Sequence, residues 1–221
     1  MARSRSENYE DIRLGILTNA ARLFASQGYE RSSIGDLADA CRLSRGALYH
    51  YFDSKEAILY AMLETHVRGM LKRLHDALSV VGSSPMNQLA ALIEAAVEYN
   101  SGSPDEQIIL LYDLPSLGER EQKVVKGLER QIVDLVFDVL KRLDPAGKIT
   151  PSSRKVYTMA LLGSINYAHT WYDPHGPVKP KQYAQMTTEL FLRGFLAATS
   201  APAQSADQAV LPLRRSGSRR R

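Results

Sequence analysis

Three serines, Ser33, Ser44 and Ser54, each stand directly before a run of residues with helical spacing. Serine is a preferred N-cap residue, because its side-chain oxygen accepts a hydrogen bond from a backbone N–H of the first helical turn. Asp36 follows Ser33 at the three-residue spacing of a capping box, which strengthens the first of these helix starts. Three helix starts within so short a stretch leave room for only two short helices between the first cap and the last.

The residues around these caps predict where the helices end. A longer helix over about 9–27 comes first and stops before Gly28, since glycine readily adopts the left-handed conformation that ends a helix. Two short helices follow, over about 33–41 and 44–52, and a turn at Arg42-Leu43 joins them. Two short helices joined by a tight turn and braced by a longer helix have the proportions of a helix-turn-helix.

The remainder of the chain also has helical patterns, and no strand pattern competes with them. A long helix begins at Lys55 and links the first three helices to the rest. Glycine, proline and aspartate separate further helices, which we expect over about 86–100, 105–113, 119–143, 152–172 and 181–198. The sequence therefore predicts an all-α protein with a helix-turn-helix unit over 1–54, a larger helical C-terminal unit over 55–199 and a basic tail over 200–221.

One side of the second short helix is predicted to face outward. If Leu48 and Phe52, four residues apart, pack inward, then Arg45, Tyr49 and His50 point to the surface. Such a surface suits DNA, because arginine forks onto guanine O6 and N7 while tyrosine and histidine donors reach phosphates.

Neighbouring residues fit the same interpretation. Gly46 and Ala47 are small enough to let the helix N-terminus approach a groove closely, and Lys55 stands at a helix start where a phosphate is favoured. The full predicted set is Ser33, Ser44, Arg45, Gly46, Ala47, Tyr49, His50, Tyr51 and Lys55. The alternative is that the rings only pack the three-helix core, which we expect for Phe52 and in part for Tyr51. Ser33 can cap a helix and contact a phosphate at once.

The run AARLFASQGYERSSIGDLADA, followed by LSRGALYHYFDSKEAI, resembles the N-terminal DNA-binding domain of the tetracycline-repressor (TetR) family. The resemblance covers residues 10–60 nearly without gaps and involves many spaced positions. Arg42 stands where the family usually has the glycine of the turn, and Tyr51 stands where it often has histidine. An arginine at a positive φ costs on the order of 1 kcal/mol relative to glycine, which a packed turn tolerates.

The resemblance also implies a homodimer, because the last two long helices of each TetR-family subunit pair into a four-helix bundle. The spacing of the residues alone shows two amphipathic helices, which could equally pack inside one subunit. The segment NYAHTWYDPHGPVKP, residues 166–180, is similar to a TetR subset that controls the breakdown of fatty acids, steroids or aromatic acids and often responds to acyl-coenzyme A thioesters. Trp171 and Tyr172 either close the dimer bundle or contact the ligand.

A small-molecule effector is expected to occupy an apolar cavity between helices, with a few polar groups that orient it. The polar side chains of the C-terminal unit that we consider candidates for this role are His66, Tyr99, Tyr112, Asn166 and Thr170.

The net positive charge of the chain comes from the tail. The formal net charge is +4, but Arg214, Arg215, Arg219, Arg220 and Arg221 supply five positive charges, so residues 1–213 carry −1. The folded part is therefore not basic, and contacts with nucleic acid must come from locally placed groups. The tail is rich in Ala, Ser, Pro and Arg, and we expect it to be disordered, either as a solvated end or as a dedicated binding arm.

Other classes of site have little support in the sequence. The single cysteine, Cys41, excludes an internal disulfide and a Cys-rich metal site, and the histidines lack metal-ligand spacing. A nucleophile with its base and orienting acid is not visible, so we expect no catalytic residue, metal or cofactor. No apolar run reaches the roughly 18 residues of a membrane span, and the N-terminal residues lack the apolar stretch of a signal peptide. We expect a cytoplasmic protein without a membrane partner.

The residues and the resemblance together predict a ligand-responsive transcriptional regulator. We expect a repressor that a small hydrophobic effector, such as an acyl-coenzyme A, releases from a palindromic operator in double-stranded DNA. A second interpretation within the family is a regulator of an efflux or stress gene that responds to a drug-like ligand. Two interpretations of other classes are a helical-bundle enzyme with a DNA-binding head and a pure interaction module, although the latter gives the outward arginine and tyrosines no role.

Overall fold

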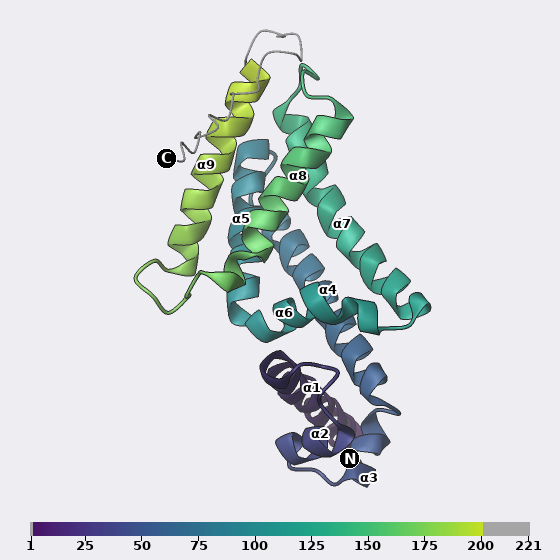
Figure 1. Cartoon of the computed structure of the whole chain (residues 1–221). Helices are drawn as coiled ribbons and strands as arrows, with labels where there is room; N and C mark the ends of the chain where they lie inside the picture. Colours follow the sequence, from purple (N-terminus) through teal and green to yellow (C-terminus); the bar gives the residue numbers. More distant parts are fainter. Residues whose placement is uncertain (1, 201–221) are drawn as a thin grey trace, which may run out of the picture.

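The structure is a computed structural model, which describes residues 2–200 of the 221-residue chain, with side chains from residue 8 onward. Every regular element in this part is a helix, so the predicted all-α fold is confirmed (Figure 1). The elements are α1 (Ala2–Gln27), α2 (Ile34–Cys41), α3 (Arg45–Tyr51), α4 (Lys55–Val80), α5 (Pro85–Gly102), α6 (Pro104–Asp113), the 3-10 helix η1 (Leu114–Ser116), α7 (Glu119–Leu143), α8 (Pro151–Asn166), the 3-10 helix η2 (Ala168–Thr170) and α9 (Pro180–Ser200). The predicted tail over 200–221 lies outside the described residues, apart from Ser200.

Helices α1, α2 and α3 gather at one end of the molecule, and we call them the head (Figure 1). Helix α1 buries one face through Ile16, Ala20 and Phe24, which recur at helical spacing. Leu37 of α2 and Leu48 of α3 are completely buried in the same core. Helices as short as α2 and α3, with 8 and 7 residues, are not stable alone, so this packing holds them in place.

The core of the head continues into the rest of the molecule. Leu59 and Leu63 of α4, Ile109 of α6, Leu114 of η1 and Val125 of α7 belong to the same buried cluster as the head residues. The long α4 leaves the head and runs into the larger part of the molecule (Figure 1). Because one core spans residue 54, the division of the chain at that residue stays a prediction.

A second buried cluster holds the larger part together. Leu74 of α4, Ile93 of α5, Leu140 of α7, Leu161 of α8 and Phe195 of α9 belong to it. Helix α5 lies between α4 and α9, and α7 contributes to both clusters along its length. No helix in the described part of the chain is long and apolar enough to cross a bilayer.

Two helices have ends that differ from the prediction. Helix α1 begins at Ala2 instead of about residue 9. The prediction missed this first part because its residues are polar and carry no apolar periodicity. The helix predicted over 152–172 ends at Asn166, and η2 follows it. Pro174 restricts the residue before it to extended conformations, so the winding tightens ahead of it. The N–H groups of residues 171 and 172 accordingly both bond to the Ala168 carbonyl oxygen, at 3.1 and 2.8 Å.

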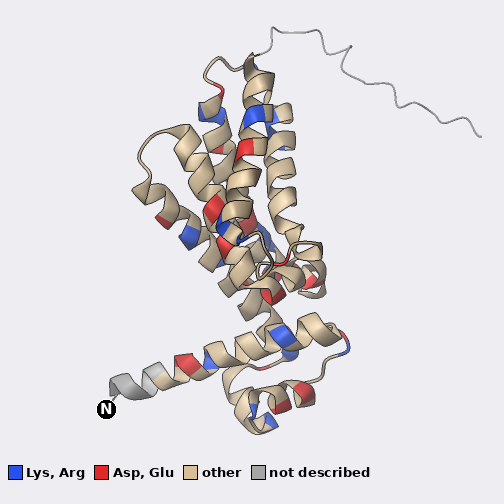
Figure 2. Ribbon diagram, turned by 90° about the vertical axis from the view of Figure 1, so that its left-hand side faces the viewer, with Lys and Arg blue, Asp and Glu red and all other residues tan. Residues whose placement is uncertain are grey.

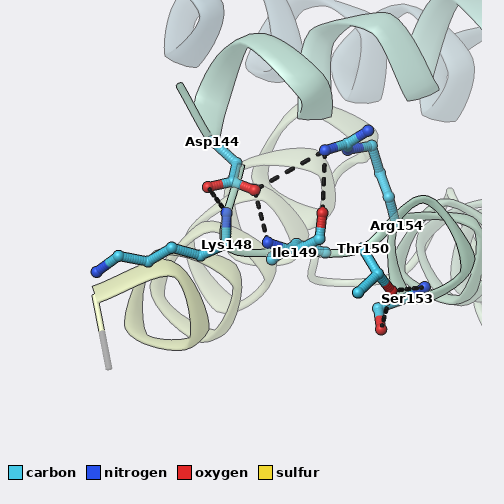
Figure 3. A network of polar contacts seen from close by, with 6 residues as sticks. All are labelled: Asp144, Lys148, Ile149, Thr150, Ser153 and Arg154. Atoms are coloured by element: carbon cyan, nitrogen blue, oxygen red, sulfur yellow. Dashed lines mark hydrogen bonds and ion pairs between the residues drawn. The ribbon is translucent and has the colours of Figure 1, made fainter. Parts of the chain in front are cut away.

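A buried acid fixes the start of α8 (Figure 3). The Asp144 carboxylate accepts the backbone N–H groups of Lys148 (3.1 Å) and Ile149 (2.8 Å). Arg154 of α8 lies 3.8 Å from the same carboxylate and donates to the Ile149 carbonyl oxygen at 3.2 Å. Thr150 caps α8 by accepting the Ser153 N–H at 3.2 Å. These contacts hold the α7–α8 connection and thereby place the inner face of α8.

Candidate nucleic-acid interface and internal cavity

Helix α3 presents a polar surface because its apolar residues turn toward the core. Leu48 is completely buried, and Phe52, the C-cap residue, is 6% exposed. Arg45, Tyr49 and His50 lie on the other side and are exposed. The predicted orientation of α3 is confirmed, whereas the contact of these residues with DNA stays a prediction.

A left-handed residue sets the angle between α2 and α3. Arg42 has φ 55° and ψ 39°, and its N–H bonds to the Asp39 carbonyl oxygen at 3.0 Å. The Leu43 N–H bonds to the Ala38 carbonyl oxygen at 2.9 Å, which closes the end of α2. The positive φ expected for the arginine that replaces the usual glycine is therefore confirmed.

The two predicted serine caps of the head are formed. Ser33 Oγ accepts the Asp36 N–H at 3.1 Å, and the Asp36 carboxylate accepts the Ser33 N–H at 2.8 Å and the Ser33 hydroxyl at 2.7 Å. These bonds lower the pKa of Asp36. Ser44 Oγ accepts the Ala47 N–H at 3.1 Å. Both serines are exposed, so a phosphate contact remains compatible with capping.

The guanidinium group of Arg45 lies across the start of α2. Its Nη2 is 2.7 Å from the position that a Cβ atom on Gly35 would occupy, so the glycine makes room for it. The nearby charge also contributes to the lowered pKa of Asp36. Gly46 beside it is exposed and Ala47 is partly exposed, which leaves the beginning of α3 open to an approaching groove. Figure 2 shows basic and acidic residues interspersed on the described part of the head, rather than a continuous basic stripe.

Tyr51 has a packing role as well as a predicted DNA contact. Its ring lies 4.8 Å from that of Tyr9 on α1, at an interplanar angle of 30°. The exposed His50 ring stands edge-on, 5.4 Å from Tyr51 and 6.1 Å from Tyr9. The partial packing role expected for Tyr51 is confirmed.

The ammonium group of Lys55 makes contacts within the protein in this structure, and the phosphate contact predicted for it stays a prediction. Its ammonium group donates to the carbonyl oxygens of Tyr29 (2.8 Å) and Ser32 (3.0 Å), with Glu30 at 3.5 Å. It also lies 4.2 Å from the centre of the Tyr29 ring, in a cation–π position. The three donors of the ammonium are thus directed at the α1–α2 connection, and Lys55 ties α4 to the head.

A second set of contacts joins the start of α4 and the α1–α2 connection to the segment between α6 and α7. The Gly118 N–H, at the N-cap of α7, donates to Glu56 Oε1 at 2.9 Å. The Ser116 hydroxyl of η1 donates to Glu30 Oε1 at 3.4 Å. Acidic residues at the start of α4 and in the α1–α2 connection therefore hold the segment between α6 and α7.

A cavity of about 320 Å³ lies between α4, α5, α6, α7 and α8. Its wall is largely apolar and includes Val67, Met70, Leu74, Leu92, Ile93 and Val136. Two predicted ligand residues, His66 and Asn166, line it, and Gln107 and Glu129 do so as well. The volume is at the lower end of the roughly 300–1,000 Å³ that small-molecule sites occupy.

The other three predicted ligand residues do not line this cavity. Tyr99 packs behind the wall, where its hydroxyl donates to the His66 carbonyl oxygen at 2.9 Å. Tyr112 is 57% exposed, because its position on α6 faces away from the cavity. Thr170 is exposed in η2, and its hydroxyl donates to the Tyr167 carbonyl oxygen at 2.9 Å. The structure therefore gives no support to a ligand contact by these three residues in this cavity, and their role stays a prediction.

Burial shapes the titration of the polar groups in the cavity. His66 is 4% exposed, and desolvation lowers its pKa, so the imidazole is neutral at pH 7. Its Nε2 lies 3.2 Å from Gln107 Oε1. Desolvation raises the pKa of Glu129, although Lys126 opposes this effect. Glu129 was not among the predicted ligand residues, but its place between Val125 and Ile132, in the apolar spacing along α7, is a signal in the sequence that indicates it.

A smaller space of about 50 Å³ adjoins the end of α8. Gln107 and Asn166 border both spaces, and Asn100 Nδ2 donates to Asn166 Oδ1 at 3.3 Å. Tyr172 also borders the small space and stacks on Tyr183, with ring centres 4.7 Å apart, whereas Trp171 is 65% exposed.

The outer surface of α8, α9 and the segment between them carries large apolar side chains. The exposed ones are Val156, Met159, Tyr167, Trp171, Met186 and Leu190. Large apolar side chains left exposed on two successive helices indicate an interaction surface. Elsewhere in the part of the chain that the structure describes, no group of three or more His, Cys, Asp or Glu residues is placed to hold a metal ion.

Comparison with known proteins identifies the family. Residues 16–62 match the family profile described as bacterial regulatory proteins, tetR family, and residues 82–195 match the tetracyclin repressor-like C-terminal domain. A TetR-family transcriptional regulator from Bordetella parapertussis superimposes with a TM-score of 0.80 at 38% identity, over 85% of this chain and 97% of that one.

Two further relatives cover most of both chains. The transcriptional repressor KstR2 of Mycolicibacterium smegmatis is 24% identical over 81% of this chain and 88% of its own. The structure of AibR with isovaleryl coenzyme A and operator DNA has a TM-score of 0.72 at 24% identity, over 81% of this chain and 97% of that one. The chain therefore belongs to the TetR family and is a DNA-binding transcriptional regulator.

Proposed function

We propose that the chain is a homodimeric repressor that releases its operator when a small hydrophobic effector fills the cavity. The observation that carries this proposal is the physical connection between the cavity and the head. Helix α4 lines the cavity with His66 and begins at Lys55 against the head. Helix α6 lines the same cavity with Gln107 and packs against α1. An effector that prefers one arrangement of α4 and α6 thereby shifts the head.

The head, assigned to residues 1–54, binds the operator through α3. Arg45 reads a base edge. The remaining members of the predicted set, apart from Lys55, contact the DNA backbone or let it approach: Ser33, Ser44, Gly46, Ala47, Tyr49, His50 and Tyr51. Because its operator is genomic DNA, we place the protein in the cytoplasm. The segment over 55–199 binds the effector and the partner subunit.

The apolar surface of α8 and α9 supports the homodimer. Leu190 is 78% exposed and Met186 is 57% exposed, which isolated subunits rarely sustain over one face. A twofold dimer places two copies of α3 in successive major grooves, so the operator is an inverted repeat with half-sites about one helical turn, or a small multiple of it, apart.

An acyl thioester is the effector class that we propose first. The support is the fold shared with AibR, which binds isovaleryl coenzyme A, and an apolar cavity that suits an acyl chain. A drug-like ligand of an efflux or stress regulator is the second candidate. The carboxylate of Glu129 in the apolar wall favours such a ligand when it is cationic, because a buried charge is stable only when it is paired.

The proposal is tested by selecting genomic fragments that the purified protein binds and then asking which compounds release them. The expected result is a set of fragments with a common inverted repeat, released by acyl thioesters or other hydrophobic compounds. Selected fragments without a dyad, or a protein that no hydrophobic compound releases from its operator, would contradict it.

A further inference from the structure

The wall of the cavity is nearly free of charge. Among the described residues that line it, Glu129 is the one with a carboxylate, and no lysine or arginine accompanies it. The other polar side chains of the wall are the imidazole of His66, which is neutral at pH 7, the amides of Gln107 and Asn166, and the phenol of Tyr167. A bound anion would therefore meet a negative charge and find no cation in the wall.

His66 and Gln107, two uncharged polar residues of the wall, can form hydrogen bonds with a ligand. Gln107 Oε1 is an acceptor, so His66 Nε2 carries the proton of the 3.2 Å contact between them. Gln107 lines the cavity, and its amide N–H groups donate to no other side chain or backbone oxygen in the described part of the chain. This pair, on α4 and α6, suits a carbonyl or hydroxyl oxygen of a ligand.

The size of the cavity limits what it can hold. Its volume of about 320 Å³ lies near the lower end of the range that small-molecule sites occupy. An acyl chain of moderate length suits such a space. We expect the coenzyme A part of a thioester to lie outside it, because its phosphates are anionic and the wall carries no lysine or arginine. The charge that meets the wall is therefore that of the acyl end alone.

We infer that Glu129 sets the charge selectivity of the cavity, which admits an uncharged or cationic apolar ligand and rejects the corresponding free carboxylic acid. This inference rests on the proposed function and deepens it, since an acyl thioester is neutral at its carbonyl carbon and its hydrolysis product is not. A carboxylate beside Glu129 would bring two like charges into a site with little water, which strongly disfavours the pair of ionised forms.

The test uses three compounds with one hydrocarbon chain: octanoic acid, 1-octanol and octylamine. Calorimetry at pH 7 on the full chain measures each affinity for the wild type, for Glu129→Gln and for the control Glu119→Gln, an exposed glutamate on the same helix. We expect the wild type to bind octanoate at least about tenfold more weakly than 1-octanol. In Glu129→Gln the octanoate affinity rises and the octylamine affinity falls, while the 1-octanol affinity and the control stay unchanged.

Shifts of opposite sign for the acid and the amine separate a charge effect from a general loosening of the cavity. Octanoate that binds the wild type as tightly as 1-octanol, or affinities that Glu129→Gln moves in the same direction, would overturn the selectivity and leave the ligand-responsive function standing. If none of the three compounds binds either variant, while operator binding persists, the inference and the effector site of the proposed function both fail.

Discussion

The ammonium group of Lys55 lies 4.2 Å from the centre of the Tyr29 ring and donates to the Tyr29 carbonyl oxygen at 2.8 Å. The first residue of α4 is thereby fastened to the α1–α2 connection. Burial, followed by the negative charge of Glu56, raises the pKa of Tyr29 to about 12, so its ring stays neutral beneath the cation. The helix that lines the cavity thus has a defined attachment to the head.

Lys55→Met keeps the length of the side chain and removes its charge. Hydrogen bonds to a charged donor contribute about 1.5–3 kcal/mol, so we expect a loss of stability on the order of 1–2 kcal/mol, because the freed carbonyl groups gain water. Chemical denaturation measures this loss. The salt dependence of operator binding should keep its slope, since the ammonium faces the protein; a slope lower by about one ion would restore the phosphate contact that the sequence suggested.

Arg45→Ala tests whether the Arg45 side chain recognises a base pair of the operator. Arg45 is exposed, so the fold should persist, while discrimination at one base pair falls by about 1–3 kcal/mol. Competition binding with operators altered at single positions measures this change. Arg120→Ala, an exposed arginine at the start of α7, is the matched control and should bind every operator as the wild type does. Equal discrimination in both variants would remove Arg45 from the interface.

The features of the head that depend only on residues close together in the sequence could be predicted from it. The capping box of Ser33 and the left-handed turn at Arg42 are local features, and both are present. The role of Lys55 was not predictable, because its acceptors at Tyr29 and Ser32 come from a distant segment of the chain. A helix start looks open in sequence even when a loop covers it.

The cavity shows the same limit. His66 and Asn166 line the cavity, which fits the expectation that a few polar groups interrupt an apolar wall. Tyr112 and Thr170 met that expectation equally well and lie on the surface. Only the packing of five helices decides which polar residue of an amphipathic helix faces inward.

Leu190→Glu tests the homodimer. Leu190 is 78% exposed on α9, and burying a carboxylate at a subunit interface without a partner is expected to weaken dimerisation by about 3 kcal/mol. Analytical ultracentrifugation at micromolar concentration should show monomers and the operator affinity should fall. Val80→Glu, at a residue 80% exposed at the end of α4, should leave the dimer intact. A dimer that survives Leu190→Glu places the subunit interface elsewhere.

Glu129 also predicts a pH dependence of stability. Burial raises its pKa above the ordinary 4.5, so the folded state binds a proton more tightly than the unfolded chain does. The ionised carboxylate therefore lowers stability as the pH rises above 4.5 through the folded pKa, and it has no effect at lower pH, where both states are protonated. Glu129→Gln should raise Tm at pH 7, and the gain should vanish below pH 4.5. Glu119→Gln is the control. If Glu129→Gln raised Tm equally at pH 7 and below pH 4.5, the carboxylate of Glu129 would be excluded as the cause.

The last prediction concerns the transmission of effector binding to the head. The same α6 and α7 that line the cavity enclose the segment whose Gly118 N–H donates to Glu56 at the start of α4, at 2.9 Å. Effector and operator affinities are coupled by about 1–3 kcal/mol in regulators of this kind, which is roughly 5- to 150-fold and must be reciprocal. Glu56→Ala removes the acceptor and should bring this factor toward one, although each ligand still binds alone. Glu56→Gln keeps an acceptor oxygen and should keep the coupling. Calorimetry of an effector, with and without operator DNA, measures the factor in all three proteins. If Glu56→Ala retains the wild-type factor, the signal reaches the head through α4 or the α1–α6 contact instead.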